Sequence, residues 1–203
     1  MADTTDDGSV RLQPDSSETE ILVTTSIIAL VLASTLIGEQ PAPPARPHVA
    51  VDIIAARPDD VSTIDGIVKA FYDVISGPAG QPRQWARDRT LYRPDVRFVA
   101  MGVRDGKPVA RVMSHQEYVD GSDAAFVRDG FFEAEIHRDV QQLGSMAHVW
   151  STYESRQKAG GPVIDRGINS IQLYLDGARW WIAAVMWEDE RKDNPIPPKY
   201  LKE

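Results

Sequence analysis

Three consecutive stretches near the carboxyl terminus carry most of the information about the fold: Ala147–Arg156 (AHVWSTYESR), Arg166–Asp176 (RGINSIQLYLD) and Arg179–Glu190 (RWWIAAVMWEDE). Each is rich in aromatic and β-branched residues and is bounded by turn residues, so each predicts a β-strand. Asp176-Gly177 predicts a hairpin between the last two. Four of the five tryptophans lie in these strands. The pattern predicts a curved antiparallel sheet with one strongly apolar face, which is a setting for a pocket.

The region upstream of these strands predicts three helices. Apolar residues recur at helical spacing from Asp59 to Ile75, and Gly77-Pro78 ends that helix. A second helix is expected from about Pro82 to Tyr92, with Trp85 facing inward. Ser114-His115-Gln116-Glu117 is a capping box that opens a third helix, through about Val127.

The remaining strands lie between and after these helices. Residues 96–102 and 108–113 predict a hairpin around Asp105-Gly106. From Phe132 to Val140 apolar residues alternate with Glu133 and Glu135, so the carboxylates are expected on the wet face. Helices grouped on one side of an antiparallel sheet make this an α+β domain.

Composition excludes several classes of function. The 203-residue chain has a formal charge of −8, much of it in the acidic residues 1–20, so no basic face for nucleic acid is expected. There is no cysteine, which excludes disulfides and thiolate chemistry. Residues 1–20 are polar and are expected to be disordered.

Residues 21–38 (ILVTTSIIALVLASTLIG) contain no charge. They resemble the apolar core of an export signal or a membrane anchor, although the preceding segment is acidic rather than basic. An exported or membrane-anchored protein is the expectation, with membrane contact only through 21–38 if they are not cleaved. A cytoplasmic protein in which this run is buried is the alternative. Residues 39–58 predict a Pro-rich linker, 59–191 the folded domain, and 192–203 a Pro-rich tail.

Four motifs in this order resemble the nuclear transport factor 2-like superfamily, in particular its bacterial SnoaL-like branch. They are YDVISGPAG at Tyr72–Gly80, AHVWSTYESR, RGINSIQL and the RWW…W ending. The resemblance implies a cone: a strongly bent antiparallel sheet wrapped around a long N-terminal helix, with two further helices. It also implies a pocket at the open end and a homodimer formed through the sheet. The superfamily contains isomerases, cyclases, dehydratases and non-catalytic modules, so the fold alone does not choose a function.

Several side chains are candidates for the pocket. Strand alternation places Asn169 on the inward face with Ile171, and a buried amide needs hydrogen-bond partners. Aromatic residues and a histidine complete the candidate set, which is Tyr72, Trp85, His148, Trp150, Asn169 and Trp187. Such a lining would suit a small hydrophobic or planar ligand.

Two of these residues are candidates for catalysis. His148 shares a strand face with Glu154 and could act as a base with that carboxylate as its orienting group. Tyr72 resembles the helix tyrosine that donates to an enolate oxygen in isomerases of this fold. No phosphate loop, nucleophile elbow or metal-ligand pair is present, so neither a cofactor nor a metal is expected. The sequence predicts a small-molecule-binding domain; the alternatives are a cofactor-independent isomerase, lyase or cyclase, and a non-catalytic dimerising module.

Overall fold

The computed structural model describes residues 48–201, and the expectations for 1–38 lie outside this range. Its helices are α1 (Pro58–Val61), α2 (Ile64–Ile75), α3 (Trp85–Arg89), α4 (His115–Asp129) and the 3₁₀ turn η1 (Pro198–Tyr200). Its strands are β1 (Tyr92–Arg104), β2 (Lys107–Met113), β3 (Phe132–Leu143), β4 (Met146–Arg156), β5 (Asp165–Asp176) and β6 (Arg179–Asp189). Within this described part, no helix is long and apolar enough to cross a membrane.

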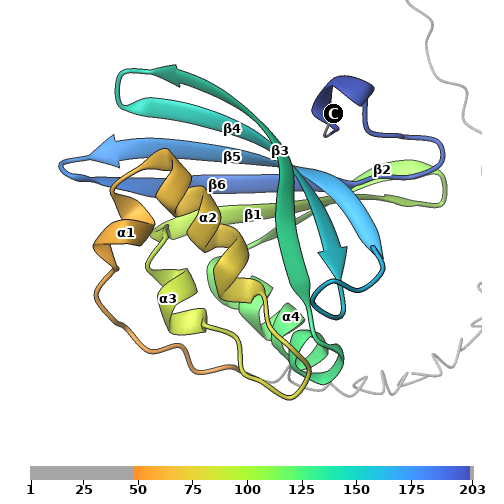
Figure 1. Cartoon of the computed structure of the whole chain (residues 1–203), viewed down its shortest axis with the longest axis horizontal. Coiled ribbons are helices and arrows are strands. Elements are labelled where there is room, and N and C mark those ends of the chain that lie inside the picture. The colour runs from red at the N-terminus through yellow and green to blue at the C-terminus, as the bar shows by residue number, and fades with distance from the viewer. Residues whose placement is uncertain (1–47, 202–203) are drawn as a thin grey trace, which may run out of the picture. The chain divides into compact units, whose positions relative to one another are not determined.

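The strands form one six-stranded sheet in the order β2-β1-β6-β5-β4-β3, and helices α1 to α4 lie against one side of it (Figure 1). The sheet is mixed, because β1 and β6 pair in parallel while every other pair is antiparallel. The prediction of a purely antiparallel sheet was therefore wrong. The chain passes from β2 through α4 to the far edge, and three antiparallel turns then return β6 beside β1 in the same direction. The α+β class is confirmed.

The predicted long first helix is divided into two. α1 ends at Val61, and α2 begins after Thr63. The backbone of Thr63 is extended, and its side-chain hydroxyl caps α2 by accepting from the Gly66 N–H at 2.9 Å. α2 has 12 residues and a strongly amphipathic pattern. Its buried face, with Ile67 and Val74 fully covered, forms the centre of the hydrophobic core beneath the sheet. Apolar burial of this kind stabilises the short helix far more than its own propensity does.

The face of β3 that meets the helices differs from the expectation. Glu133 lines a cavity on the helix-covered side, and Glu135 bonds there to Ser151, so these carboxylates point inward. Phe132 and Ala134 alternate with them and point the other way. The prediction that Glu133 and Glu135 lie on the wet face was therefore wrong. On β3 the apolar side chains Phe132 and Ala134 lie on the face away from the helices, and the carboxylates lie on the face toward them.

The last residues of the predicted linker pack against the domain. The Val49 N–H donates to Asp120 on α4 at 2.9 Å, and the Gln116 side chain donates to the Val49 carbonyl at 2.8 Å. Val51 and Ala56 pack against the core. Five prolines and several small residues made 39–58 look like free chain, but these contacts attach its described part, residues 48–58, to α4 and to the core.

The carboxyl-terminal tail folds back over the convex face of the sheet. Ile196 is buried, and the Tyr200 ring lies 5.9 Å from the Trp150 ring and 6.4 Å from that of His137. Apart from η1 the tail is irregular, as its prolines predicted. The homodimer implied by the resemblance stays a prediction, and a dimer through this face would have to accommodate the tail.

Candidate functional site

A cavity of about 210 Å³ lies between α2, α4 and the concave face of the sheet. We call it the acidic cavity. Its walls are aromatic, and its polar groups come from four strands and from α4. The aromatic wall residues are Phe71, Phe98, Tyr118, Phe126, Phe131 and Trp187. The carboxyl groups are Glu133, Asp165 and Asp189, and Tyr153, Asn169, Ser122 and Ser155 add hydroxyl and amide groups.

The aromatic walls are packed against one another in fixed geometry. Phe98 and Tyr118 are stacked with their centroids 4.8 Å apart, and Tyr118 meets Trp187 edge to face at 6.1 Å. Phe126 stacks on Phe131 at 4.1 Å. Such pairs are worth about 0.5–1.5 kcal/mol beyond their buried area. They hold the apolar walls of the cavity in place, and apolar surroundings strengthen charge interactions.

Glu133 has the most perturbed carboxyl group in the cavity. Its side chain is half-buried by surface area because it faces the cavity, yet protein surrounds it closely enough that desolvation raises its pKa to about 8. A hydrogen bond with Asn169 opposes this rise, while the charges of Asp189 and Asp165 add to it. Near neutral pH Glu133 therefore largely keeps its proton, and the cavity holds both a carboxylic acid and a carboxylate.

The other two carboxyl groups lie toward one side of the cavity. The Tyr153 hydroxyl donates to Asp189, and burial together with this carboxylate raises the pKa of the tyrosine. Asp165 is exposed at the mouth, where partial burial and the charge of Asp189 raise its pKa. Among residues 48–201, no lysine, arginine or histidine lines this cavity. Its negative charge is therefore without a neighbouring protein cation inside the cavity.

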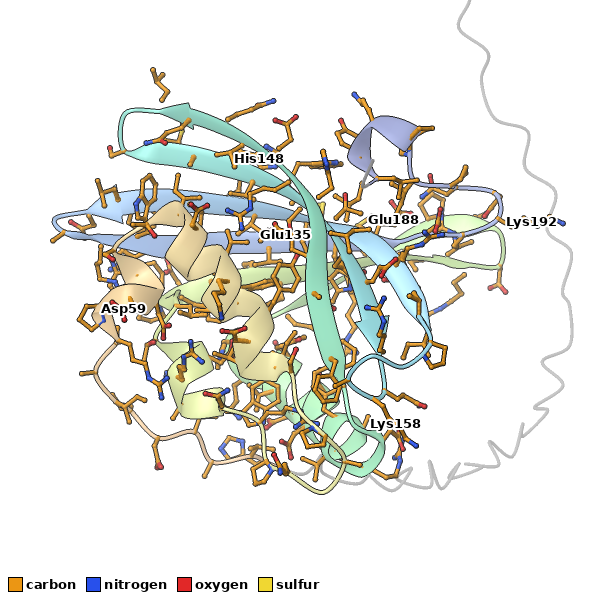
Figure 2. All side chains as sticks on the ribbon, viewed as in Figure 1. Asp59, Glu135, His148, Lys158, Glu188 and Lys192 are labelled. Carbon is orange, nitrogen blue, oxygen red and sulfur yellow. The ribbon has the colours of Figure 1, made fainter. Side chains whose placement is uncertain are left out.

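A chain of hydrogen bonds leads from Asn169 away from the cavity. Asn169 donates to the Tyr72 hydroxyl at 3.2 Å, which lies 2.6 Å from the Ser151 hydroxyl. Ser151 in turn donates to Glu135, whose place on β3 is labelled in Figure 2. Arg138 holds Glu135, with its Nε at 2.9 and 3.0 Å from the two carboxylate oxygens. These contacts satisfy the buried polar groups and fix the orientation of the Asn169 amide.

The predicted site residues separate into two groups. Asn169, which is 4% exposed, and Trp187 line the acidic cavity. Tyr72 lies directly behind Asn169, where burial raises its pKa, and it does not line the cavity itself. Trp85 is buried below the cavity, stacked on Phe126, and its indole N–H donates to Asp123 at 2.6 Å.

His148 and Trp150 lie on the convex face of β4, in contrast to the pocket prediction. Their neighbours Ser151 and Tyr153 point inward to Tyr72 and Asp189, so alternation turns His148 and Trp150 outward. His148 lies 2.9 Å from the Ser170 hydroxyl and meets Trp150 edge to face. Trp150 borders a groove of about 270 Å³ beneath the tail. Neither His148 nor Tyr72, the two residues predicted to be catalytic, lines the acidic cavity.

The carboxylates of the cavity were missed by sequence reasoning. Asp165 and Asp189 were not among the predicted site residues, and Glu133 was expected on the wet face of its strand. Strand parity carried the missing signal, because Asp189 is two residues from Trp187 and Asp165 is four from Asn169. Each acid therefore shares a face with a residue that was already expected to point inward.

Metal binding has no visible site in this part of the chain. Among residues 48–201, no group of three or more histidine, aspartate or glutamate side chains is arranged to hold a metal ion. Asp189 accepts from Tyr153, Glu133 is hydrogen-bonded to Asn169, and Asp165 accepts from the Arg166 N–H at 3.0 Å. What the arrangement offers is hydrogen bonding, charge and proton exchange.

The fold is similar to several solved bacterial structures. A Shewanella baltica NTF2-like protein of unknown function is 10% identical over 64% of this chain and 92% of its own, with a TM-score of 0.45. A Nostoc punctiforme protein of unknown function, with a cystatin-like fold, is 9% identical over 64% and 90%, with a TM-score of 0.47. A Mycobacterium tuberculosis protein of unknown function is 18% identical over 66% and 75%, with a TM-score of 0.46.

NTF2-like proteins are thus among the structures similar to this chain. No protein-family model matches the sequence, and no curated protein does.

Proposed function

We propose that this domain, whose fold resembles the nuclear transport factor 2-like superfamily, binds a small molecule that joins an aromatic or apolar body to a basic nitrogen. The observation that carries the proposal is the lining of the acidic cavity: Glu133, Asp165 and Asp189 set in aromatic walls, with no cation among the lining residues described in the structure. The sequence alone predicted an apolar ligand. The carboxyl groups in the lining are the reason for proposing that the ligand also carries a basic nitrogen.

The charge of the cavity favours a cation over a neutral ligand. Carboxylates in a poorly hydrated site are costly without a partner, and Glu133 avoids part of that cost by keeping its proton. A bound ammonium group would supply the missing partner, and faces of Tyr118 and Trp187 would add cation–π attraction. An anionic ligand would be repelled by the carboxylates and would find no cationic side chain among the described lining residues.

Binding of a cation should release the Glu133 proton. The pKa of the free carboxyl is about 8, and a neighbouring positive charge favours the ionised form. Affinity should therefore rise with pH up to about 8, by up to about tenfold per pH unit where a full proton is released, and then level off.

Calorimetric titration with benzyltrimethylammonium tests the proposal, since its charge does not change with pH. Binding is expected for this probe, and not for phenylacetate or benzyl alcohol. Glu133→Gln should abolish the pH dependence, and Asp189→Asn should weaken binding by ~10-fold or more. Glu188→Gln is the matched control, because Glu188 borders the convex groove and not the cavity. Equal binding of benzyl alcohol, or equal effects of the Asp189 and Glu188 variants, would refute the proposal.

A cofactor-independent isomerase or lyase is a second candidate, favoured by one specific observation. The cavity holds a protonated Glu133 and an Asp189 carboxylate that accepts from Tyr153. A proton donor and a proton acceptor in one cavity are the requirement for moving a proton on a bound ligand. Exchange of the α-hydrogens of cyclohexanone with D₂O, followed by NMR, tests this. Exchange should be faster than in buffer and lost in Asp189→Asn; a rate equal to that of buffer would exclude this activity for the probe.

A further inference from the structure

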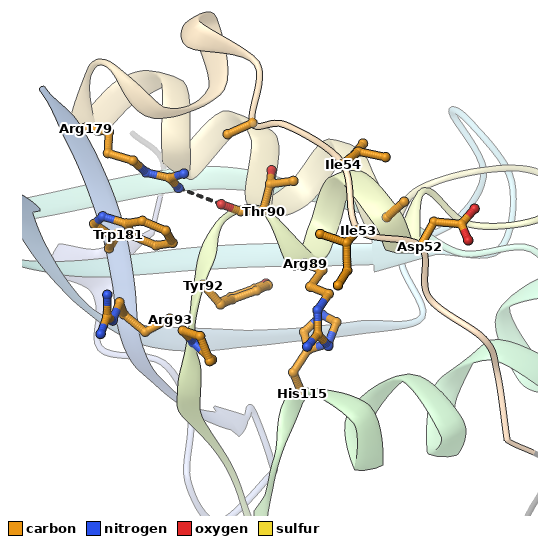
Figure 3. Close-up of a pocket in the computed structure, with 13 residues that line it drawn as sticks. Asp52, Ile53, Ile54, Arg89, Thr90, Tyr92, Arg93, His115, Arg179 and Trp181 are labelled. Carbon is orange, nitrogen blue, oxygen red and sulfur yellow. Dashed lines mark hydrogen bonds between the residues drawn. The ribbon is translucent and has the colours of Figure 1, made fainter.

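A second cavity, of about 200 Å³, is formed by the segment before α1, by α3 and by the starts of β1, α4 and β6 (Figure 3). None of its lining residues lines the acidic cavity. We call it the arginine pocket, because Arg89, Arg93 and Arg179 lie in its wall. These three side chains come from three different elements, so the fold, and not one basic run of sequence, brings them together.

The three arginines lack acidic partners. Among residues 48–201, none of them forms an ion pair with an aspartate or glutamate. Other arginines of the domain do: Arg87 binds Asp60 through two bonds of 2.7 Å. Arg87 is therefore paired with a protein carboxylate, whereas the three arginines of the pocket are not paired with one among the described residues.

Arg179 is held in position by its neighbours. Its guanidinium lies 3.4 Å from the ring centroid of Trp181 and donates from Nη2 to the Thr90 carbonyl at 2.5 Å. Arg93 also lies over Trp181, at 5.6 Å (Figure 3). Burial lowers the pKa of Arg179, as expected for a cation that has lost part of its hydration. The Trp181 ring holds Arg179 and lies below Arg93, and the faces of these guanidinium groups contact the ring while N–H groups at their edges can donate to a ligand.

The two carboxylates near this pocket, Asp52 and Asp88, do not pair with its arginines. Asp52, which is exposed, is the one carboxylate among its described lining residues. Asp88 is completely buried and bonds through Oδ2 to His115 Nε2 at 2.8 Å. The imidazole thus stands between Asp88 and the pocket, since His115 lines the pocket and Asp88 does not.

The opposite wall is apolar. Ile53 and Ile54 border the pocket, and Ile53 is 88% exposed, an unusual position for a large aliphatic side chain. The segment that carries them is anchored through Val49 to Asp120 on α4. A ligand seated on the arginines would cover this aliphatic surface.

We propose that the arginine pocket binds a small organic anion, with a carboxylate or phosphate head group on the arginines and an apolar body against Ile53 and Ile54. Guanidinium groups bind both oxyanions through charge-assisted, often paired hydrogen bonds. The volume of about 200 Å³ lies below the usual ~300–1,000 Å³ of pockets for drug-sized ligands, which limits the ligand to a small one.

Calorimetric titration of the full chain with benzoate, inorganic phosphate and benzyl alcohol tests the site. Benzoate should bind, and Arg89→Gln and Arg93→Gln should each weaken its binding by ~10-fold or more. Arg97→Gln is the matched control, since Arg97 lies on β1, is exposed and does not line the pocket. Higher salt should weaken binding in the wild type. Thermal unfolding of each variant establishes that it is folded.

The arms of the experiment separate the outcomes. Binding of benzoate alone supports an organic carboxylate, and binding of phosphate as well supports a site governed by its head group. An unchanged affinity for benzoate in Glu133→Gln shows that the acidic cavity is not involved. The proposal is overturned if neither anion binds, if benzyl alcohol binds as well as benzoate, or if the Arg97 variant loses as much affinity as the Arg93 variant.

Discussion

Tyr153 donates its phenolic hydrogen to Asp189, and the bond connects β4 to β6 across the intervening strand β5. It passes over Gly167 on β5, where the absence of a side chain leaves the necessary room. A Cβ at Gly167 would lie 2.3 Å from the Tyr153 oxygen and 2.6 Å from the Glu188 carbonyl. The arrangement of acids in the cavity therefore depends on a glycine in the strand between them.

Gly167→Ala should destabilise the domain. The added methyl group must displace Tyr153 or the β6 backbone, and overpacking of this kind costs about 1–3 kcal/mol. Urea denaturation measures the loss. Gly102→Ala is the control, because a Cβ at that strand position meets nothing within 4 Å. Similar stabilities for the two variants would show that Gly167 is not required for the packing described.

Tyr153→Phe should cost about 1–3 kcal/mol, because Asp189 then loses a hydrogen-bond donor inside the cavity. Tyr174→Phe provides the comparison, since the Tyr174 hydroxyl has no hydrogen-bond partner among residues 48–201. Its effect should be within about 0.5 kcal/mol of zero. Equal losses for both substitutions would argue against a contribution from the bond to Asp189.

Glu133→Gln should change how stability depends on pH. The folded pKa of about 8 lies above the ordinary value of 4.5, so the folded state binds the proton more tightly than the unfolded state. This contribution is complete below pH 4.5 and is lost as pH rises to about 8, at up to about 1.4 kcal/mol per pH unit. The stability of the variant relative to the wild type should therefore increase across this interval, as measured by denaturation at several pH values. Parallel curves, like those expected for Glu188→Gln, would contradict the assigned environment of Glu133.

Arg83→Gln should destabilise the loop that follows α2. The Arg83 guanidinium is buried and donates to the carbonyls of Gly77 at 2.8 Å and Gln81 at 3.0 Å. Hydrogen bonds from a charged donor contribute about 1.5–3 kcal/mol, so a loss in that range is expected in thermal or urea unfolding. Arg97→Gln, at an exposed position, should change stability by less than about 0.5 kcal/mol. If Arg83→Gln lost no more stability than Arg97→Gln, the anchoring role of Arg83 would be contradicted.

The sequence predicted the elements well and the faces of the strands less well. Asn169 was expected to point inward from its alternation with Ile171, and it does. The same reasoning failed on β3, because it took the side with Phe132 and Ala134 for the inner one. Both faces of this sheet are covered, one by helices and the other partly by the tail, so apolar content does not tell the two sides apart.

The positions of the acidic residues in the cavity could not be predicted from local sequence pattern, because they depend on contacts between distant segments. Glu133 meets Asn169, and Tyr153 meets Asp189, 36 residues further along the chain. Strand parity links Asp189 to Trp187, but only the pairing of strands shows that both face the same hollow as Glu133. The arginine pocket was missed for the same reason, since Arg179 lies 90 residues from Arg89.

β6 is the last strand to be synthesised, yet it lies in the interior of the sheet between β1 and β5. Until Arg179–Asp189 leave the ribosome, the β1–β2 hairpin and the β3–β5 meander have no shared hydrogen-bonded neighbour. A nascent or truncated chain therefore exposes two unpaired strand edges at once, which are surfaces prone to aggregation. Completion of the domain has to wait for its carboxyl-terminal residues, and premature termination there should yield insoluble protein.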